Sequence, residues 1–158
     1  MYLTKEEEAI LNGEKGEVPE RMLRLLSRLG EIYGADKMIP IGSVQVAGVS
    51  YKSIGEPGTA FLEDLAEKNA KVQVLTYLNP AGMDLENWEA IGFPKDFAVN
   101  QLRIMDAFKK MGIIVMSTCT PYLAGNLPRF REHIAWSESS AVSFSNSVIG
   151  ARTNREGG

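Results

Sequence analysis

The succession of apolar runs, glycine or proline turns and amphipathic stretches is the feature that most constrains the fold. Residues 71–78, KVQVLTYL, are typical of a strand that ends at an Asn-Pro-Ala-Gly turn, residues 79–82. Asp96 is placed to cap the helix that follows, whose apolar stripe is Leu102, Met105, Phe108 and Met111. An apolar run then begins at Gly112. This order of strand, turn, helix and strand predicts an α/β fold with a mainly parallel sheet flanked by helices. Right-handed crossovers are expected to join its consecutive strands.

Other segments fit the same plan. Thr4 and Glu7 have the spacing of a capping box, which predicts a short helix ending at the glycines that follow. Apolar residues recur at helical spacing over residues 19–34. Residues 38–51 are apolar and β-branched with glycine interruptions, which favours one or two strands, and residues 59–69 predict a helix.

The only cysteine lies in the run GIIVMSTCTPY, residues 112–122. Its apolar beginning predicts a central strand, and Pro121 cannot extend a ladder, so Cys119 is expected in the turn after that strand. In open parallel sheets, ligands gather beyond the carboxyl ends of the strands. We therefore expect the turns at 48–50, 79–82 and 117–121 to lie close together.

Composition excludes several classes of protein. The net charge of −3 and the lack of a basic block give no reason to expect nucleic acid binding. The sequence contains neither a signal-peptide pattern nor a run of about 20 apolar residues, which predicts a soluble, cytoplasmic protein without a membrane partner. A single cysteine excludes an internal disulfide framework and a self-contained zinc or iron–sulfur site.

The last third of the chain has a different composition. Residues 112–158 hold seven serines, against four in residues 1–111, and the serine cluster is threaded with large apolar residues, so a low-complexity segment is not expected. Ser139 or Ser140 could cap a short helix whose amino end would favour an anion. Farther on, Arg152 and Arg155 are of the type that binds carboxylate or phosphate, although they could equally be solvated surface charges. Residues 150–158 show no closing helix or strand, which is typical of a domain interrupted in its middle.

Four motifs together carry a resemblance to a known family. GSVQVAGVSYKSIG, TYLNPAGMD, STCTPY and WSESSAVSFSNSVIGARTNREGG are similar to the amino-terminal part of the catalytic large subunit of the aconitase X family, over essentially all 158 residues. The resemblance implies that residues 1–158 are an incomplete part of an aconitase-like catalytic subunit of roughly twice this length. It also implies two partners: the remaining carboxyl-terminal part of the subunit, and a small swivelling-domain subunit that closes the active site.

The resemblance also implies a reaction. The archaeal members that the chain most resembles are hydro-lyases that convert (R)-mevalonate 5-phosphate, a small phosphorylated hydroxy acid, to trans-anhydromevalonate 5-phosphate in a modified mevalonate pathway of isoprenoid synthesis. Another branch of the family dehydrates cis-3-hydroxyproline, which is the main alternative substrate that the resemblance leaves open for this chain. The implied cofactor is an iron–sulfur cluster of the 4Fe-4S type acting as Lewis acid, with Cys119 as one ligand and the remaining ligands outside this chain.

The same resemblance assigns a substrate site and leaves the general base to a serine of the partner subunit. The implied substrate-binding residues are Gly48, Val49, Ser50, Asn79, Pro80 and Ser139. Glycine lets a backbone come close to a ligand, and serine and asparagine can hydrogen-bond phosphate or carboxylate oxygens.

Each of these assignments has a simpler alternative. Cys119 could be a buried core thiol, the two glycine and proline turns could be ordinary strand ends, and Ser139 could only cap a helix. Two other classes of function also stay open. One is a cysteine-nucleophile enzyme, against which the only histidine, His133, lies 14 residues beyond the thiol. The other is a non-catalytic binding or scaffold domain.

Overall fold

The computed structural model describes residues 1–80, 82–118, 125, 127–137 and 154–156. The chain divides into two compact units, Met1–Pro40 and Ile41–Gly158, each of which is described by itself. Along the described residues, no helix combines the length and the apolar composition that a membrane crossing needs.

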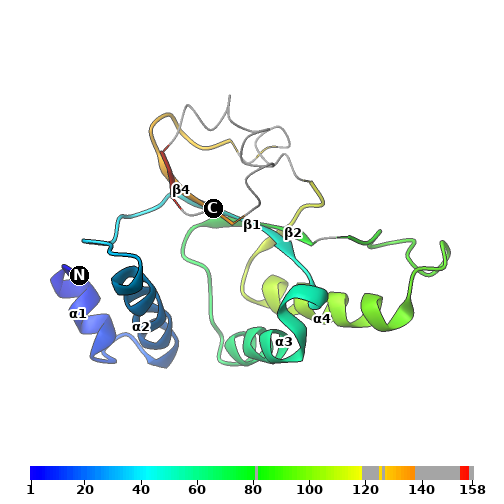
Figure 1. Ribbon diagram of the computed structural model, residues 1–158, viewed down its shortest axis with the longest axis horizontal. Coiled ribbons are helices and arrows are strands. Elements are labelled where there is room, and N and C mark those ends of the chain that lie inside the picture. Colours follow the sequence, from blue (N-terminus) through cyan, green and yellow to red (C-terminus); the bar gives the residue numbers. More distant parts are fainter. Residues whose placement is uncertain (81, 119–124, 126, 138–153, 157–158) are drawn as a thin grey trace. The chain divides into compact units, whose positions relative to one another are not determined.

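The first unit is a pair of helices, α1 (Lys5–Leu11) and α2 (Glu17–Ile32) (Figure 1). The capping box predicted at the start of α1 is present: the Glu7 amide donates to the Thr4 hydroxyl over 3.3 Å, and the Thr4 amide donates to the Glu7 carboxylate over 2.6 Å. A bridge between Tyr2 and Lys37 closes the unit. Both predicted helices are therefore confirmed.

The second unit is built on a parallel sheet, as the sequence predicted. Its strands are β1 (Ser43–Val49), β2 (Leu75–Pro80), β3 (Ile114–Val115), β4 (His133–Ser137) and β5 (Asn154–Glu156). They lie in the order β3-β2-β1-β4-β5, and each neighbouring pair is parallel. Strand β1 lies at the centre, so the chain first extends the sheet on one side of β1 and then on the other.

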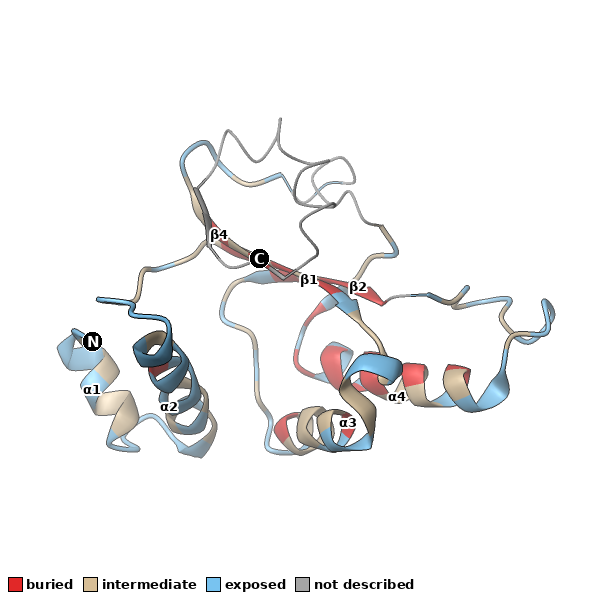
Figure 2. Ribbon diagram, viewed as in Figure 1, coloured by how far each residue is buried: buried red, intermediate tan, exposed pale blue. Residues whose placement is uncertain are grey.

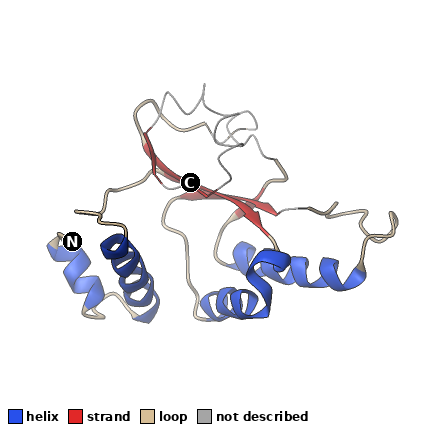
Figure 3. Cartoon of the chain, viewed as in Figure 1, coloured by secondary structure: helices blue, strands red, loops and turns tan. Residues whose placement is uncertain are grey.

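Helices α3 (Tyr51–Glu67) and α4 (Lys95–Lys110) pack side by side on one face of the sheet (Figure 3). The two crossovers, β1-α3-β2 and β2-α4-β3, step in the same direction along the sheet, and crossovers of one hand must then place both helices on one face. The inward surface of α4 and the strands supply the buried residues (Figure 2), among them Leu78 and Ile104, each with no exposed surface.

Three predictions about the strands are wrong. Residues 112–122 do not supply a central strand, since β3 has two residues and is the edge strand of the described sheet, with Ile114 45% exposed. The strand predicted over 71–78 runs instead from Leu75 to Pro80, because pairing with β1 continues to its last residue. Contrary to expectation, a strand does form near the end of the sequence: β5 pairs with β4.

Two predicted helix starts are also wrong. Helix α3 begins at Tyr51 instead of 59, because Ser50 forms a capping box there and a kink at Gly55 (φ 59°) accommodates Gly55 and Pro57 within the helix. Asp96 does not cap α4: the N-cap is Pro94, and Asp96 lies in the first helical turn, where its charge suits the helix dipole.

An ionic network holds α4 against the part of helix α3 that follows the kink at Gly55. The Arg103 guanidinium donates to both carboxylate oxygens of Glu56, over 2.8 and 2.9 Å, and to both oxygens of Glu63, over 2.8 and 2.9 Å. These hydrogen bonds hold the pKa of each glutamate below its usual value and raise the pKa of Arg103. Burial, followed by the bond to Glu56, raises the pKa of Tyr51.

The network predicts an acid-sensitive contribution to stability. The pKa values of Glu56 and Glu63 are lower in the folded state than in the unfolded state, so their contribution is present above the unfolded pKa and is lost as pH falls through the folded pKa. We expect the Tm of the wild type to fall more steeply than that of Arg103→Met between about pH 5 and pH 3. The control is Lys68→Met, which removes an exposed partner of Asp64. Parallel Tm curves for the wild type and Arg103→Met would contradict this.

Candidate functional site

The two loops that the sequence predicted to converge lie side by side at the carboxyl ends of β1 and β2. Ala47 is in register with Asn79, and Val49 is in register with Pro80. The register shifts between Ala47 and Val49, so Gly48 forms a bulge at the end of the strand. The predicted proximity of residues 48–50 and 79–80 is therefore confirmed.

Gly48 has a backbone conformation that explains why glycine stands there. Its φ of 70° lies in the left-handed region, where a Cβ atom is unfavourable, and the residue is exposed. The bulge bends β1 away from a regular ladder just before helix α3 begins. Backbone groups of this loop are thereby presented at the edge of the sheet.

Ser50 links this loop to helix α3. Its hydroxyl accepts from the Lys52 amide over 3.2 Å, and its own amide donates to the Ser53 hydroxyl over 3.3 Å. The Ser53 amide donates to the Ser50 carbonyl over 2.9 Å. A hydroxyl that accepts a hydrogen bond still carries one O–H donor, so Ser50 can cap the helix and bind a ligand oxygen at once.

A buried residue that the sequence did not single out supports the loop from behind. Gln101 on α4 has no exposed surface, and its side-chain amide donates to the Val49 carbonyl over 2.8 Å. Its carbonyl oxygen accepts from the Tyr51 amide over 3.0 Å. The available signal was a polar residue within an apolar helical stripe, between the buried positions Ala98 and Met105.

The other predicted site residues lie outside the described residues. Cys119 follows β3 in the sequence. Val115 of β3 is in register with Leu78 of β2, and the amide of the next residue, Met116, donates to the Leu78 carbonyl over 2.8 Å. Ser139 follows β4, which pairs with β1 on its other side. The four strands that precede the predicted site residues are thus adjacent and leave the sheet at one edge. The roles of all six substrate residues and of Cys119 stay predictions.

A cavity of about 310 Å³ adjoins the loop. It is lined by Ser50, Lys52, Gly82, Phe93, Pro94 and Phe97, and the Lys52 ammonium lies 5.7 Å from the centroid of the Phe97 ring. Its walls come from the start of α3, the segment after β2 and the start of α4. The cavity is mostly apolar with one cationic residue at its margin, which suits a small anionic ligand with a hydrocarbon body.

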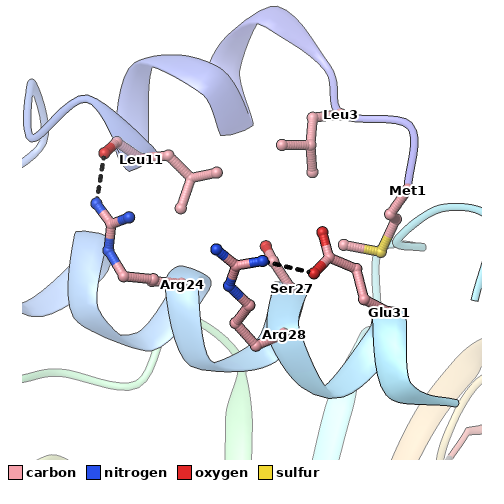
Figure 4. Close-up of a pocket in the computed structure, with 7 residues that line it drawn as sticks. All are labelled: Met1, Leu3, Leu11, Arg24, Ser27, Arg28 and Glu31. Carbon is pink, nitrogen blue, oxygen red and sulfur yellow. Dashed lines mark hydrogen bonds and ion pairs between the residues drawn. The ribbon is translucent and has the colours of Figure 1, made fainter.

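A second cavity, of about 150 Å³, lies in the helical unit and contains none of the predicted residues (Figure 4). Its charged residues bond one another or the backbone: Arg28 pairs with Glu31 over 2.8 Å, and Arg24 donates to the Leu11 carbonyl over 3.3 Å. Such partly exposed pairs are ordinary surface interactions, so the strand-end loops remain the candidate site.

The side chains available as metal ligands limit what this chain can contribute to the expected iron–sulfur centre. Among the described residues, no three His, Cys, Asp or Glu side chains gather as a metal ligand group. The chain has one cysteine, and a cluster with an open iron position needs three cysteine ligands. This chain can therefore provide one thiolate of such a centre but not the whole of it.

Comparisons with known proteins agree with this architecture. The family profile described as the aconitase X first domain matches residues 1–158. The chain is 64% identical to the phosphomevalonate dehydratase large subunit of Methanocaldococcus jannaschii, over 100% of this chain and 39% of that protein. It is 36% identical to the cis-3-hydroxy-L-proline dehydratase of Pseudomonas aeruginosa, over 94% of this chain and 25% of that protein.

A solved structure shows the same fold. The crystal structure of Thermococcus kodakaraensis aconitase X in its holo-form superposes with a TM-score of 0.81 at 57% identity, covering 100% of this chain and 39% of that one. The chain thus spans about two fifths of the length of its more similar relatives. Profile, identity and fold agree over the whole sequence, and the chain belongs to the aconitase X family.

Proposed function

We propose that this chain is the amino-terminal part of the large subunit of a phosphomevalonate dehydratase. The reaction removes water from (R)-mevalonate 5-phosphate to give trans-anhydromevalonate 5-phosphate, a step toward isoprenoids. One observation carries the choice of substrate: five archaeal relatives with this name match the whole chain at 44–64% identity, whereas the two hydroxyproline dehydratases match at 34–36%.

The loops at the ends of β1 and β2 supply groups suited to binding this substrate. Gly48 lets the backbone approach closely, and Ser50 and Asn79 can hydrogen-bond the phosphate or carboxylate oxygens. Val49, Pro80 and Ser139 complete the proposed binding set. Loss of water takes a proton from the carbon next to the carboxylate and hydroxide from the carbon after it, so a site that fixes both ends of the substrate aligns these two bonds.

Cys119 is our candidate for one ligand of an iron–sulfur cluster, and the other ligands come from beyond this chain. When bound, such a cluster supplies an iron with an open coordination position, a Lewis acid for the leaving hydroxyl and the carboxylate. Cys119 must be deprotonated to bind it. The proposed role of the loops at the ends of β1 and β2 is to bind and orient the substrate.

The proposed enzyme needs two further pieces. They are the remaining carboxyl-terminal part of the large subunit and a small subunit, which provides the serine base; the "large subunit" in the relatives' names supports such a partner. We place the assembled enzyme in the cytoplasm. Neither nucleic acid nor membrane is among its proposed partners.

The substrate assignment predicts a clear preference. We expect the complete two-subunit enzyme, purified without oxygen, to dehydrate mevalonate 5-phosphate with a kcat/KM at least about a hundredfold higher than that for cis-3-hydroxyproline, because a site built around a phosphate group discriminates against a ligand that lacks one. Product formation followed by NMR measures both rates. Unphosphorylated mevalonate is the control substrate, and a preference for hydroxyproline would overturn the assignment.

A further inference from the structure

Gln101 connects helix α4 to a loop that is distant in sequence. Its partners, Val49 and Tyr51, lie 52 and 50 positions earlier in the chain, and both hydrogen bonds have ordinary lengths of 2.8 and 3.0 Å. The side chain has no exposed surface. Water therefore does not compete for these bonds, and the link is well defined.

The two hydrogen bonds lie on either side of Ser50. One holds the carbonyl of the residue before it, and the other holds the amide of the residue after it. Because peptide groups are planar, holding these two groups fixes the orientation of both peptide planes that flank Ser50. The direction of the Ser50 side chain is set in turn.

Packing alone does not account for a glutamine at this position. The neighbouring buried positions of α4 are filled by Ala98, Ile104 and Met105, so an apolar residue would suit the interior. The bulge at Gly48 interrupts the regular pairing of β1 just before this loop. With an apolar residue at 101, the Val49 carbonyl and the Tyr51 amide would lose the partners that the structure gives them.

We propose that Gln101 is a positioning residue that holds the 48–50 loop in the shape that binds the phosphorylated hydroxy acid. It acts through Val49 and Ser50 and needs no contact with the substrate itself. This inference rests on the function proposed above, since it takes the 48–50 loop as part of the substrate site.

The test is Gln101→Met in the complete two-subunit enzyme, since methionine has a similar length but cannot form these hydrogen bonds. We expect KM for mevalonate 5-phosphate to rise about tenfold to a hundredfold, with a smaller change in kcat, because the binding loop loses its orientation. The control is Ile104→Val, which loosens the packing of the same helix and retains the Gln101 side chain that bonds the loop. Cluster absorbance and subunit assembly are checked in each variant.

The outcomes are distinct. A raised KM in Gln101→Met beside an unchanged KM in Ile104→Val supports the proposal. An unchanged KM in Gln101→Met, or an equal rise in both variants, overturns it, since the residue then has no role in binding or only a general role in stability.

A second measurement separates this inference from the proposed function. Hydrogen exchange at the Tyr51 amide should be at least about tenfold faster in Gln101→Met than in the wild type, because the acceptor of that amide is gone. Equally slow exchange overturns the proposal whatever the substrate. If the wild type does not convert mevalonate 5-phosphate, the proposed function is overturned independently of the role of Gln101. The KM values of the two variants are then compared with cis-3-hydroxyproline as substrate.

Discussion

Replacing Cys119 by serine is expected to abolish both the cluster absorbance and the dehydratase activity of the complete enzyme. The chain has no second cysteine to take over as ligand, and a hydroxyl is a much poorer ligand for iron than a thiolate. Loss of the Lewis acid removes several kcal/mol of stabilisation from the transition state, so we expect kcat/KM to fall by at least about a thousandfold. Iron content, visible absorbance and product formation measure the three consequences.

The Cys119→Ser substitution, together with removal of iron by a chelator, separates an iron–sulfur hydro-lyase from a cysteine-nucleophile enzyme and from a domain with a structural thiol. The control is Ser117→Ala, an exposed residue of the same segment, which should keep cluster and activity. If a chelator removes the iron and full activity remains, Cys119 acts as a nucleophile. A Cys119→Ser enzyme that keeps both cluster and activity would show that the thiol is structural, and the proposed metal role would be abandoned.

Substitution of Gly48 by alanine is expected to lower kcat/KM by about a hundredfold. An alanine in the left-handed conformation costs about 1–2 kcal/mol, so the bulge can relax by turning the loop that carries Val49 and Ser50. A shift of about 1 Å in groups that orient a substrate is enough for a loss of this size. Steady-state kinetics on mevalonate 5-phosphate, with Tm measured in parallel, gives the result.

Gly34 offers a matched control for backbone strain. Its φ of 72° is close to the 70° of Gly48, no atom lies within 4 Å of an added Cβ, and it belongs to the helical unit. Gly34→Ala should therefore lower Tm while leaving kcat/KM at the wild-type value. Wild-type kinetics in Gly48→Ala would show that the bulge does not shape the substrate site.

Much of the local structure could be predicted because its causes lie within a few residues. The capping box of Thr4 and Glu7, the apolar repeat of α2 and the alternation of strands with helices are all read from neighbouring positions. The convergence of residues 48–50 with 79–80 also followed, since parallel strands place their carboxyl ends at one edge.

Helix α3 shows where local signals mislead. The sequence predicted a start at 59, and the observed helix also includes Gly55 and Pro57, two residue types that disfavour a helix interior. In the fold, Gly55 has a positive φ, and this single residue forms the kink. Pro57 lies near the start of the helical part after the kink, where a proline is tolerated, so the helix continues across the kink. The Arg103 network then holds the part after the kink against α4, and the Tyr51 hydroxyl, before the kink, donates to the Glu56 carboxylate over 3.2 Å.

The sequence by itself determined the parallel α/β plan and which loops carry polar and glycine residues, because periodicity and turn chemistry act over short distances. Only the tertiary structure decided the rest: β3 at the edge of the described sheet, β1 at its centre, and Gln101 beside a loop about 50 residues earlier. Strand order and the partner of a buried amide depend on which distant segments pack together. A single run of residues contains no local signal for either.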